Sequence, residues 1–302
     1  MRMPSLLSIS LVTMLSAACS SSGALTATDP PPSNQVAGDA QRLNSKSQLL
    51  YASNKESSAI EIYSVPGFSK VGQISNGIEE PEGIATDTHG NLYVANVDGP
   101  SVTIYKPGTT SPYRTLMGSH VPDDVAVATN GYVLTGDQGG GVDVYPPGNT
   151  SPSARLTNPG ISIVRGVGVD ANNNVYAAGT NASLKGVVIE YADMSGGGTN
   201  LGLQGLESPL GVLIDKNDDV AVSDVAANEI LIYRQGATSP SSKISVSGPH
   251  RSAFNQEQNL IYVPQGAGGD VDVLDYPSGT PVTSFSIGNF ASGTALSPAP
   301  TP

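Results

Sequence analysis

The sequence has little of several residue types on which common protein classes depend. It has a single cysteine, Cys19, so a disulfide framework is excluded. It has 14 basic and 26 acidic residues. The resulting net charge of −12 argues against nucleic acid as a partner, because phosphate contacts need clustered cations. Only 13% of the chain is charged, whereas 35 Gly and 23 Pro disfavour a helical bundle. These figures predict an acidic, turn-rich, all-β protein.

The first residues have the pattern of an export signal. Arg2 is the one charge in residues 1–18, and an apolar run from Leu6 to Leu15 is followed by small residues and Cys19. The run is too short to span a bilayer, which favours a secretory signal over a membrane helix.

Residues 15–19 (LSAAC) resemble a bacterial lipobox. The resemblance implies a lipoprotein signal peptide at 1–18, cleavage before Cys19 and a lipid on its sulfur. Ser16 departs from the leucine that a lipobox prefers at this place, and the alternative is an incidental cysteine after an ordinary cleavage site. We expect an exported protein, anchored to the bacterial cell envelope by acyl chains that insert into a membrane. Ser20 in place of Asp implies the outer membrane in a Gram-negative host.

Residues 19–45 are predicted to be the lipidated cysteine and a flexible tether. The segment is rich in Ser, Ala, Thr and Pro, and it has almost no large apolar residues. It therefore cannot bury enough apolar surface to offset the conformational entropy that the segment would lose on becoming ordered. The folded domain is predicted to occupy residues 46–302.

This domain is an internal repeat of about 40 residues. Short apolar segments begin at Gly83, Asp124, Gly166, Gly211, Ser252 and Gly293, with separations of 41, 42, 45, 41 and 41 residues. A polar turn follows each of the first five segments, and then come a second apolar run, a third run that often ends in tyrosine, and a weaker fourth run. Four short runs separated by turn residues indicate strands rather than helices. Four antiparallel strands at this period are typical of a β-propeller blade.

Residues 81–96 (PEGIATDTHGNLYVAN) closely resemble an NHL repeat, and the resemblance covers about residues 49–298. WD-repeat identity is disfavoured because the chain has no tryptophan. We predict a six-bladed β-propeller of four-stranded antiparallel blades. Residues 49–54 match a second strand, whereas the segment from Gly293 matches an innermost strand with nothing after it. The C-terminal strand is therefore expected to complete the first blade, which leaves no open inner edge.

The residues just before the inner strands are the candidate site. In propellers these positions lie around one face of the central channel, which is an expectation taken from the fold. They include Glu82, Asp123, Arg165 and Arg251, with His250 beside the last. Two acids and two arginines that converge there could bind a polar ligand, or they could pair with one another and close the channel.

The loops between second and third strands add Asn96, Asp98, Asp137, Asn181, Asp224 and Asn228 to this face. Such residues could bind Ca²⁺, but they are more often turn residues that bond their own backbone. His120 and His250 could act as general bases. They lack the spacing of a zinc motif, so no cofactor is expected beyond a Ca²⁺ ion.

Two functions fit this sequence, beside a third in which the chain is a structural or assembly lipoprotein with no small ligand. The first is a surface-anchored binding module for a protein, peptide or glycan, and the regular repeat without a catalytic motif favours it. The second is a propeller enzyme of the lactonase or lyase kind. Gluconolactonase-like enzymes, which this chain resembles in fold, hold a metal with Glu, Asn and Asp. Glu82 could take the place of their glutamate, but Arg165 and Arg251 would oppose a cation.

Overall fold

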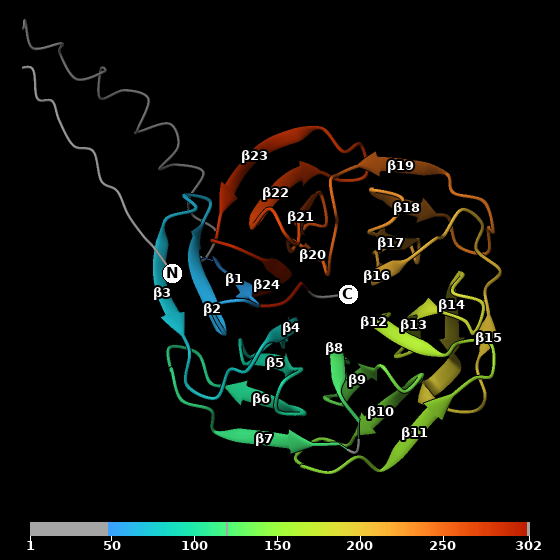
Figure 1. Cartoon of the computed structure of the whole chain (residues 1–302), viewed down its shortest axis with the longest axis horizontal. Coiled ribbons are helices and arrows are strands. Elements are labelled where there is room, and N and C mark those ends of the chain that lie inside the picture. The colour runs from blue at the N-terminus through green and yellow to red at the C-terminus, as the bar shows by residue number, and fades with distance from the viewer. Residues whose placement is uncertain (1–47, 119, 301–302) are drawn as a thin grey trace, which may run out of the picture. The chain divides into compact units, whose positions relative to one another are not determined.

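The computed structural model describes residues 48–118 and 120–300, and the predicted signal peptide, Cys19 and tether lie outside this part of the chain. The described residues form six sheets of four antiparallel strands, arranged in a ring (Figure 1). The predicted six-bladed β-propeller is confirmed. No helix among these residues is long and apolar enough to cross a membrane.

The blades follow the chain in order. Blade 1 consists of β24 (Ala291–Ser297), β1 (Gln48–Asn54), β2 (Ala59–Val65) and β3 (Lys70–Ile74). Blade 2 consists of β4 (Pro81–Thr86), β5 (Leu92–Asn96), β6 (Ser101–Tyr105) and β7 (Arg114–Met117). Blade 3 consists of β8 (Pro122–Val127), β9 (Val133–Asp137), β10 (Gly141–Tyr145) and β11 (Ala154–Thr157).

The second half repeats this order. Blade 4 consists of β12 (Ile163–Val169), β13 (Val175–Thr180), β14 (Gly186–Tyr191) and β15 (Thr199–Asn200), with the short 3-10 helix η1 (Ala192–Met194) before β15. Blade 5 consists of β16 (Pro209–Ile214), β17 (Val220–Asp224), β18 (Glu229–Tyr233) and β19 (Ser242–Ser245). Blade 6 consists of β20 (Ala253–Phe254), β21 (Leu260–Pro264), β22 (Asp270–Asp275) and β23 (Pro281–Ser286).

The hydrophobic core lies between the blades. Six clusters of buried apolar residues occur in the described part of the chain, and each joins two neighbouring blades. Second strands such as β5 and β9 are buried throughout, because both faces of the sheet meet a neighbour. This accounts for the nearly continuous apolar sequence of β5 (LYVAN), which lacks the alternation of a strand with one solvent-exposed face.

The tyrosines that end the third strands have a structural role. The Tyr105 hydroxyl donates a hydrogen bond to the Asn76 carbonyl at 2.7 Å, and Tyr233 makes the same contact with Gln204 at 2.7 Å. In both cases the acceptor lies in the linker that enters the tyrosine's own blade. Each ring packs in the core while its hydroxyl finds a polar partner, as a buried tyrosine requires. Tyr191, at the same place in blade 4, is also buried, but its hydroxyl has no hydrogen-bond partner within the described residues, so only the packing role is common to all three.

Aspartates organise the turns between first and second strands. Asp87 Oδ1 accepts the backbone N–H groups of His89 and Asn91, each at 2.9 Å. Asp170 and Asp215 repeat this arrangement in blades 4 and 5. These contacts are Asx turns, in which the side chain takes the place of a backbone acceptor.

Blade 1 is shared between the two ends of the described chain. β24 pairs with β1 in an antiparallel register that sets Leu49 opposite Ser297 and Tyr51 opposite Ala295. The prediction that the C-terminal strand completes the first blade is therefore confirmed (Figure 1).

Deleting residues 291–302 should open the ring and lower the melting temperature strongly. The deletion removes the inner strand of blade 1 and the apolar residues that β24 adds to two interfaces. Calorimetry would measure the change, with a truncation after Ser297 as the control that keeps β24 whole. An unchanged melting temperature after the longer deletion would contradict closure by β24.

Candidate functional site

A β-bulge at the start of the inner strand positions the predicted site residues. In blade 2 the pairing with β5 shifts between Pro81 and Ile84, a stretch that contains Glu82. In blades 3 and 4 the skipped residues are Asp123 and Arg165. A bulge sets two residues opposite one and so re-aims a side chain. Three of the predicted ring residues, Glu82, Asp123 and Arg165, are therefore placed by bulges that leave the ladder and turn side chains toward the channel. Arg251 lies outside the named strands, in an isolated bridge with Gly293.

Glycines next to these bulges keep the ring narrow. A Cβ added to Gly166 would lie 2.8 Å from the Gly211 Cα, and one added to Gly293 would lie 2.7 Å from the Glu82 carbonyl oxygen. Inner strands of neighbouring blades thus approach backbone to backbone. The narrow ring brings side chains from distant repeats within reach of one another.

Arg251 is the centre of a buried ion-pair network. Its Nη1 lies 2.6 Å from Glu82 Oε2, and its Nη2 lies 3.5 Å from Asp123 Oδ2. Arg165 Nη1 reaches the same Asp123 oxygen at 2.8 Å, and Lys55 Nζ reaches Glu82 Oε1 at 2.6 Å. We name Lys55, Glu82, Asp123, Arg165 and Arg251 the ring network. Its members come from blades 1, 2, 3, 4 and 6, so the network links most of the ring across the channel.

The opposite charges of the ring network stabilise the ionised forms of Glu82 and Arg251. Burial alone would raise the pKa of the Glu82 carboxyl, but Arg251 and Lys55 outweigh it and keep the pKa below its ordinary value. For Arg251, burial lowers the pKa of the guanidinium, and the acids Glu82 and Asp123 more than restore it. Glu82, Asp123 and Arg251 are all buried. Glu82 and Arg251 are therefore both ionised in the folded protein.

The remaining predicted site residue, His250, lies beside this network and bonds elsewhere. Its Nδ1 is 2.9 Å from the Gly248 carbonyl, and its ring meets Phe290 edge-on at 5.3 Å between centroids. Burial lowers the pKa of the imidazole, so the ring is neutral at pH 7. His250 therefore packs beside the ring network, and in the part of the chain that the structure describes its ring makes no hydrogen bond or ion pair with the network's side chains.

Asp124 is a functional candidate that the sequence analysis did not single out. It stands at the repeat position where four other blades have glycine, which was the available signal. Its Oδ1 accepts the Val125 N–H and its Oδ2 accepts the Val167 N–H, each at 2.9 Å. Burial raises the pKa of this carboxyl to about 7, although Arg251 and the two N–H groups act in the opposite direction.

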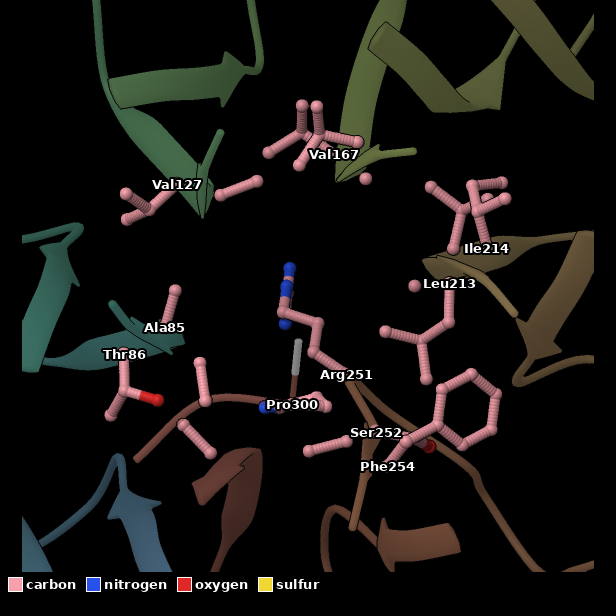
Figure 2. Close-up of a pocket in the computed structure, with 18 of the residues that line it drawn as sticks. Ala85, Thr86, Val127, Val167, Leu213, Ile214, Arg251, Ser252, Phe254 and Pro300 are labelled. Carbon is pink, nitrogen blue, oxygen red and sulfur yellow. The ribbon is translucent and has the colours of Figure 1, made fainter. Parts of the chain in front are cut away.

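A cavity of about 230 Å³ occupies the channel below the ring network. Arg251 and Asp124 form its polar end, and Figure 2 shows the Arg251 side chain in the middle of the channel, with Val127, Val167 and Leu213 around it. The opposite end lies among the turns between first and second strands, where Ala299 and Pro300 also contribute to the lining. The cavity thus extends toward the face opposite to the one that the sequence analysis favoured.

Two of the residues predicted as Ca²⁺ candidates bond their own turns. Asp224 accepts the backbone N–H groups of Ala226 and Ala227, and Asn181 accepts those of Ser183 and Lys185. These contacts fit the turn interpretation of both residues. Asp224 also accepts the N–H groups of Glu207 and Ser208 in the linker that enters its blade.

His120, Asp137 and Asp143 are the one group within the described residues whose ligand atoms approach closely enough for a metal ion, all within 4.8 Å. The Arg155 guanidinium, however, bonds both carboxylates, with Nη1 2.9 Å from Asp143 Oδ1. A fixed cation at this place disfavours a second one.

Comparison with known proteins supports the fold alone. No protein-family model matches this chain, and no curated protein matches it. Among solved structures, a chain of a structure described as a nidogen/laminin complex is similar, with a TM-score of 0.67 and 15% identity. The match covers 84% of this chain and all of the other. At this identity the similarity shows a shared propeller fold.

Replacing Glu82 by Gln should cost about 3–5 kcal/mol of unfolding free energy, because it leaves Arg251 buried with less compensation. Glu229→Gln is the matched control, since Glu229 pairs with Lys243 on the exposed surface and such pairs contribute about 1 kcal/mol or less. Urea unfolding of both variants measures the difference. Equal, small losses would show that the ring network contributes little to stability.

The Asp124 carboxyl should make stability depend on pH. Its pKa rises from 3.8 in the unfolded chain to about 7 in the fold, so the native state binds the extra proton between these values. This contribution is complete below about pH 4 and is lost as the pH rises through about 7, with about 1.4 kcal/mol for each pKa unit.

Urea unfolding of the wild type and of Asp124→Asn at several pH values isolates this group, because the other titrating residues are common to both. The advantage of the wild type over the variant should shrink from pH 4 to pH 8. A constant difference would contradict the raised pKa.

Proposed function

We propose that this chain is an exported bacterial lipoprotein whose NHL-like propeller is a binding module for a protein, peptide or glycan. The single observation that carries the binding role is the ring network. Its buried carboxylates, Glu82 and Asp123, already accept contacts from cations, so the network presents a fixed polar patch on the channel face. A preformed patch supports recognition, because little ordering is needed on binding.

Two members of the network remain accessible to a partner. The side chains of Lys55 and Arg165 are 29% and 36% exposed, whereas that of Arg251 is 6% exposed. Both exposed groups are hydrogen-bond donors, and peptide carbonyls and glycan oxygens are acceptors of the matching kind. The similar solved structure is described as a complex of two proteins, which is compatible with a binding role for the propeller fold.

The export and anchoring part of the proposal rests on residues 1–19 of the sequence. It is tested by expressing the full chain and its Cys19→Ser variant in a bacterial host. The wild type should enter the membrane fraction, with a mass that reflects loss of residues 1–18 and gain of lipid. The variant should carry no lipid. The same mass and the same fraction for both would overturn the lipid anchor.

The binding part is tested by thermal unfolding of the full chain with a panel of peptides and glycans, and with Ca²⁺ or EDTA. A ligand at a hundred times its dissociation constant adds about 2.7 kcal/mol of stability. A stabilising ligand should lose affinity in Arg165→Ala and keep it in Lys243→Ala, which removes a cation from the outer surface. Equal affinity for both variants would place the ligand elsewhere.

An enzyme of the lactonase or lyase kind remains the second candidate. Asp124 favours it, because a buried carboxyl with a pKa of about 7 beside a cavity has the protonation range of a general acid or base. The metal-dependent form fits less well, because Arg251 and Lys55 occupy the surroundings of Glu82. A rise in melting temperature with Ca²⁺ that disappears in Glu82→Gln would favour the enzyme.

A further inference from the structure

The central cavity has the composition of a small-molecule site. Inner strands around the whole ring give it a largely aliphatic and aromatic middle (Figure 2). Arg251 and Asp124 lie at one end, and Asp170, Asp215, Lys216 and Asp218 line the other end, where the turns between first and second strands lie. A cavity of about 150 Å³ in another protein holds benzene, so about 230 Å³ has room for a somewhat larger molecule. Apolar walls with a few convergent polar groups are typical of ligand pockets.

Arg251 supplies the donor at the polar end. The residue is 5% exposed, and within the described residues its guanidinium contacts the Arg165 carbonyl, Glu82 and Asp123. A guanidinium carries more N–H donors than these three contacts use. A buried donor without an acceptor costs free energy, so the cavity favours an occupant that brings an oxygen atom.

Asp124 supplies the acceptor at the same end. Each of its oxygens accepts one backbone N–H and keeps a further lone pair. A hydroxyl group suits this pair of neighbours, because it can accept from Arg251 and donate to Asp124 at once.

Charge balance argues for a neutral occupant. At this end the positive charges of Arg251, Arg165 and Lys55 already face the carboxylates of Glu82 and Asp123, and the Asp124 carboxyl, with a pKa of about 7, is only partly ionised at neutral pH. A carboxylate ligand would be repelled by Asp123, and an ammonium ligand would be repelled by Arg251. Either ion would also lose its hydration against apolar walls.

We propose that this cavity binds a small neutral alcohol or phenol, with its hydroxyl between Arg251 and Asp124 and its apolar body against Val127, Val167 and Leu213. The ligand reaches the site from the face where Ala299 and Pro300 lie, because the ring network closes the other end. The site differs from the patch proposed above in face and in ligand chemistry. The two share Arg251, but binding in the cavity does not require a partner at the patch.

Calorimetric titration of the full chain carrying Cys19→Ser, without detergent, tests the proposal with three probes of similar size. These are 4-methylphenol, toluene, which lacks the hydroxyl, and benzoate, which is an anion. We expect 4-methylphenol to bind at least tenfold more tightly than either of the others. Equal binding of toluene would overturn the role of the polar end, and tighter binding of benzoate would overturn the neutral ligand. No heat with any probe would show a cavity filled by water only.

Cavity-filling variants locate the site. Val127→Phe places a larger side chain against the cavity and should abolish 4-methylphenol binding, whereas Val282→Phe makes the same change on the exposed strand β23 and should not. Leu213→Phe, on another blade, provides a second filled cavity if the first variant fails to fold. Unchanged binding in a folded cavity-filling variant would place the probe outside the channel.

Discussion

The antiparallel pairing of β24 with β1 supports both the hydrophobic core and the polar centre of the propeller. β24 contributes Ala291 and Leu296 to the interface between blades 6 and 1, and Ala295 to the interface between blades 1 and 2. It also holds the backbone of Arg251, because Gly293 bridges to Arg251 and the Thr294 N–H donates to the Arg251 carbonyl at 3.0 Å. The ring network therefore depends on the strand that closes the ring.

The channel separates two kinds of chemistry along one short axis. On one side, the partly exposed cations Lys55 and Arg165 pair with the same carboxylates as the buried Arg251. Polar contacts with a partner are favoured on this side. On the other side, Arg251 and Asp124 meet aliphatic walls, where an unpaired charge would be costly. The same guanidinium belongs to both, so a change at Arg251 would affect the patch and the cavity together.

Much of the fold was predictable because each blade corresponds to one sequence repeat. The spacing of the apolar segments gave the number of blades, and the unmatched segment at Gly293 gave the closure. The ring residues followed from their place before each inner strand. Their mutual pairing depends on the bulges and on the close backbone contacts at Gly166 and Gly293, for which the sequence carries no signal. Asp124 was missed because a charged residue in an apolar segment has no visible partner in sequence, whereas one of its two hydrogen-bond donors, the Val167 N–H, lies 43 residues away.

The shared first blade has a consequence for the order of folding. Ser53 and Gly293, which share a hydrogen bond in blade 1, are 240 residues apart in sequence. Contacts of such long range form slowly, since the whole intervening loop must close first. During synthesis on a ribosome, β1 emerges early and cannot pair with β24 until nearly the whole chain has been made. The first blade to begin is thus the last to be completed, and until then it presents an unpaired strand edge that the cell must keep from other chains.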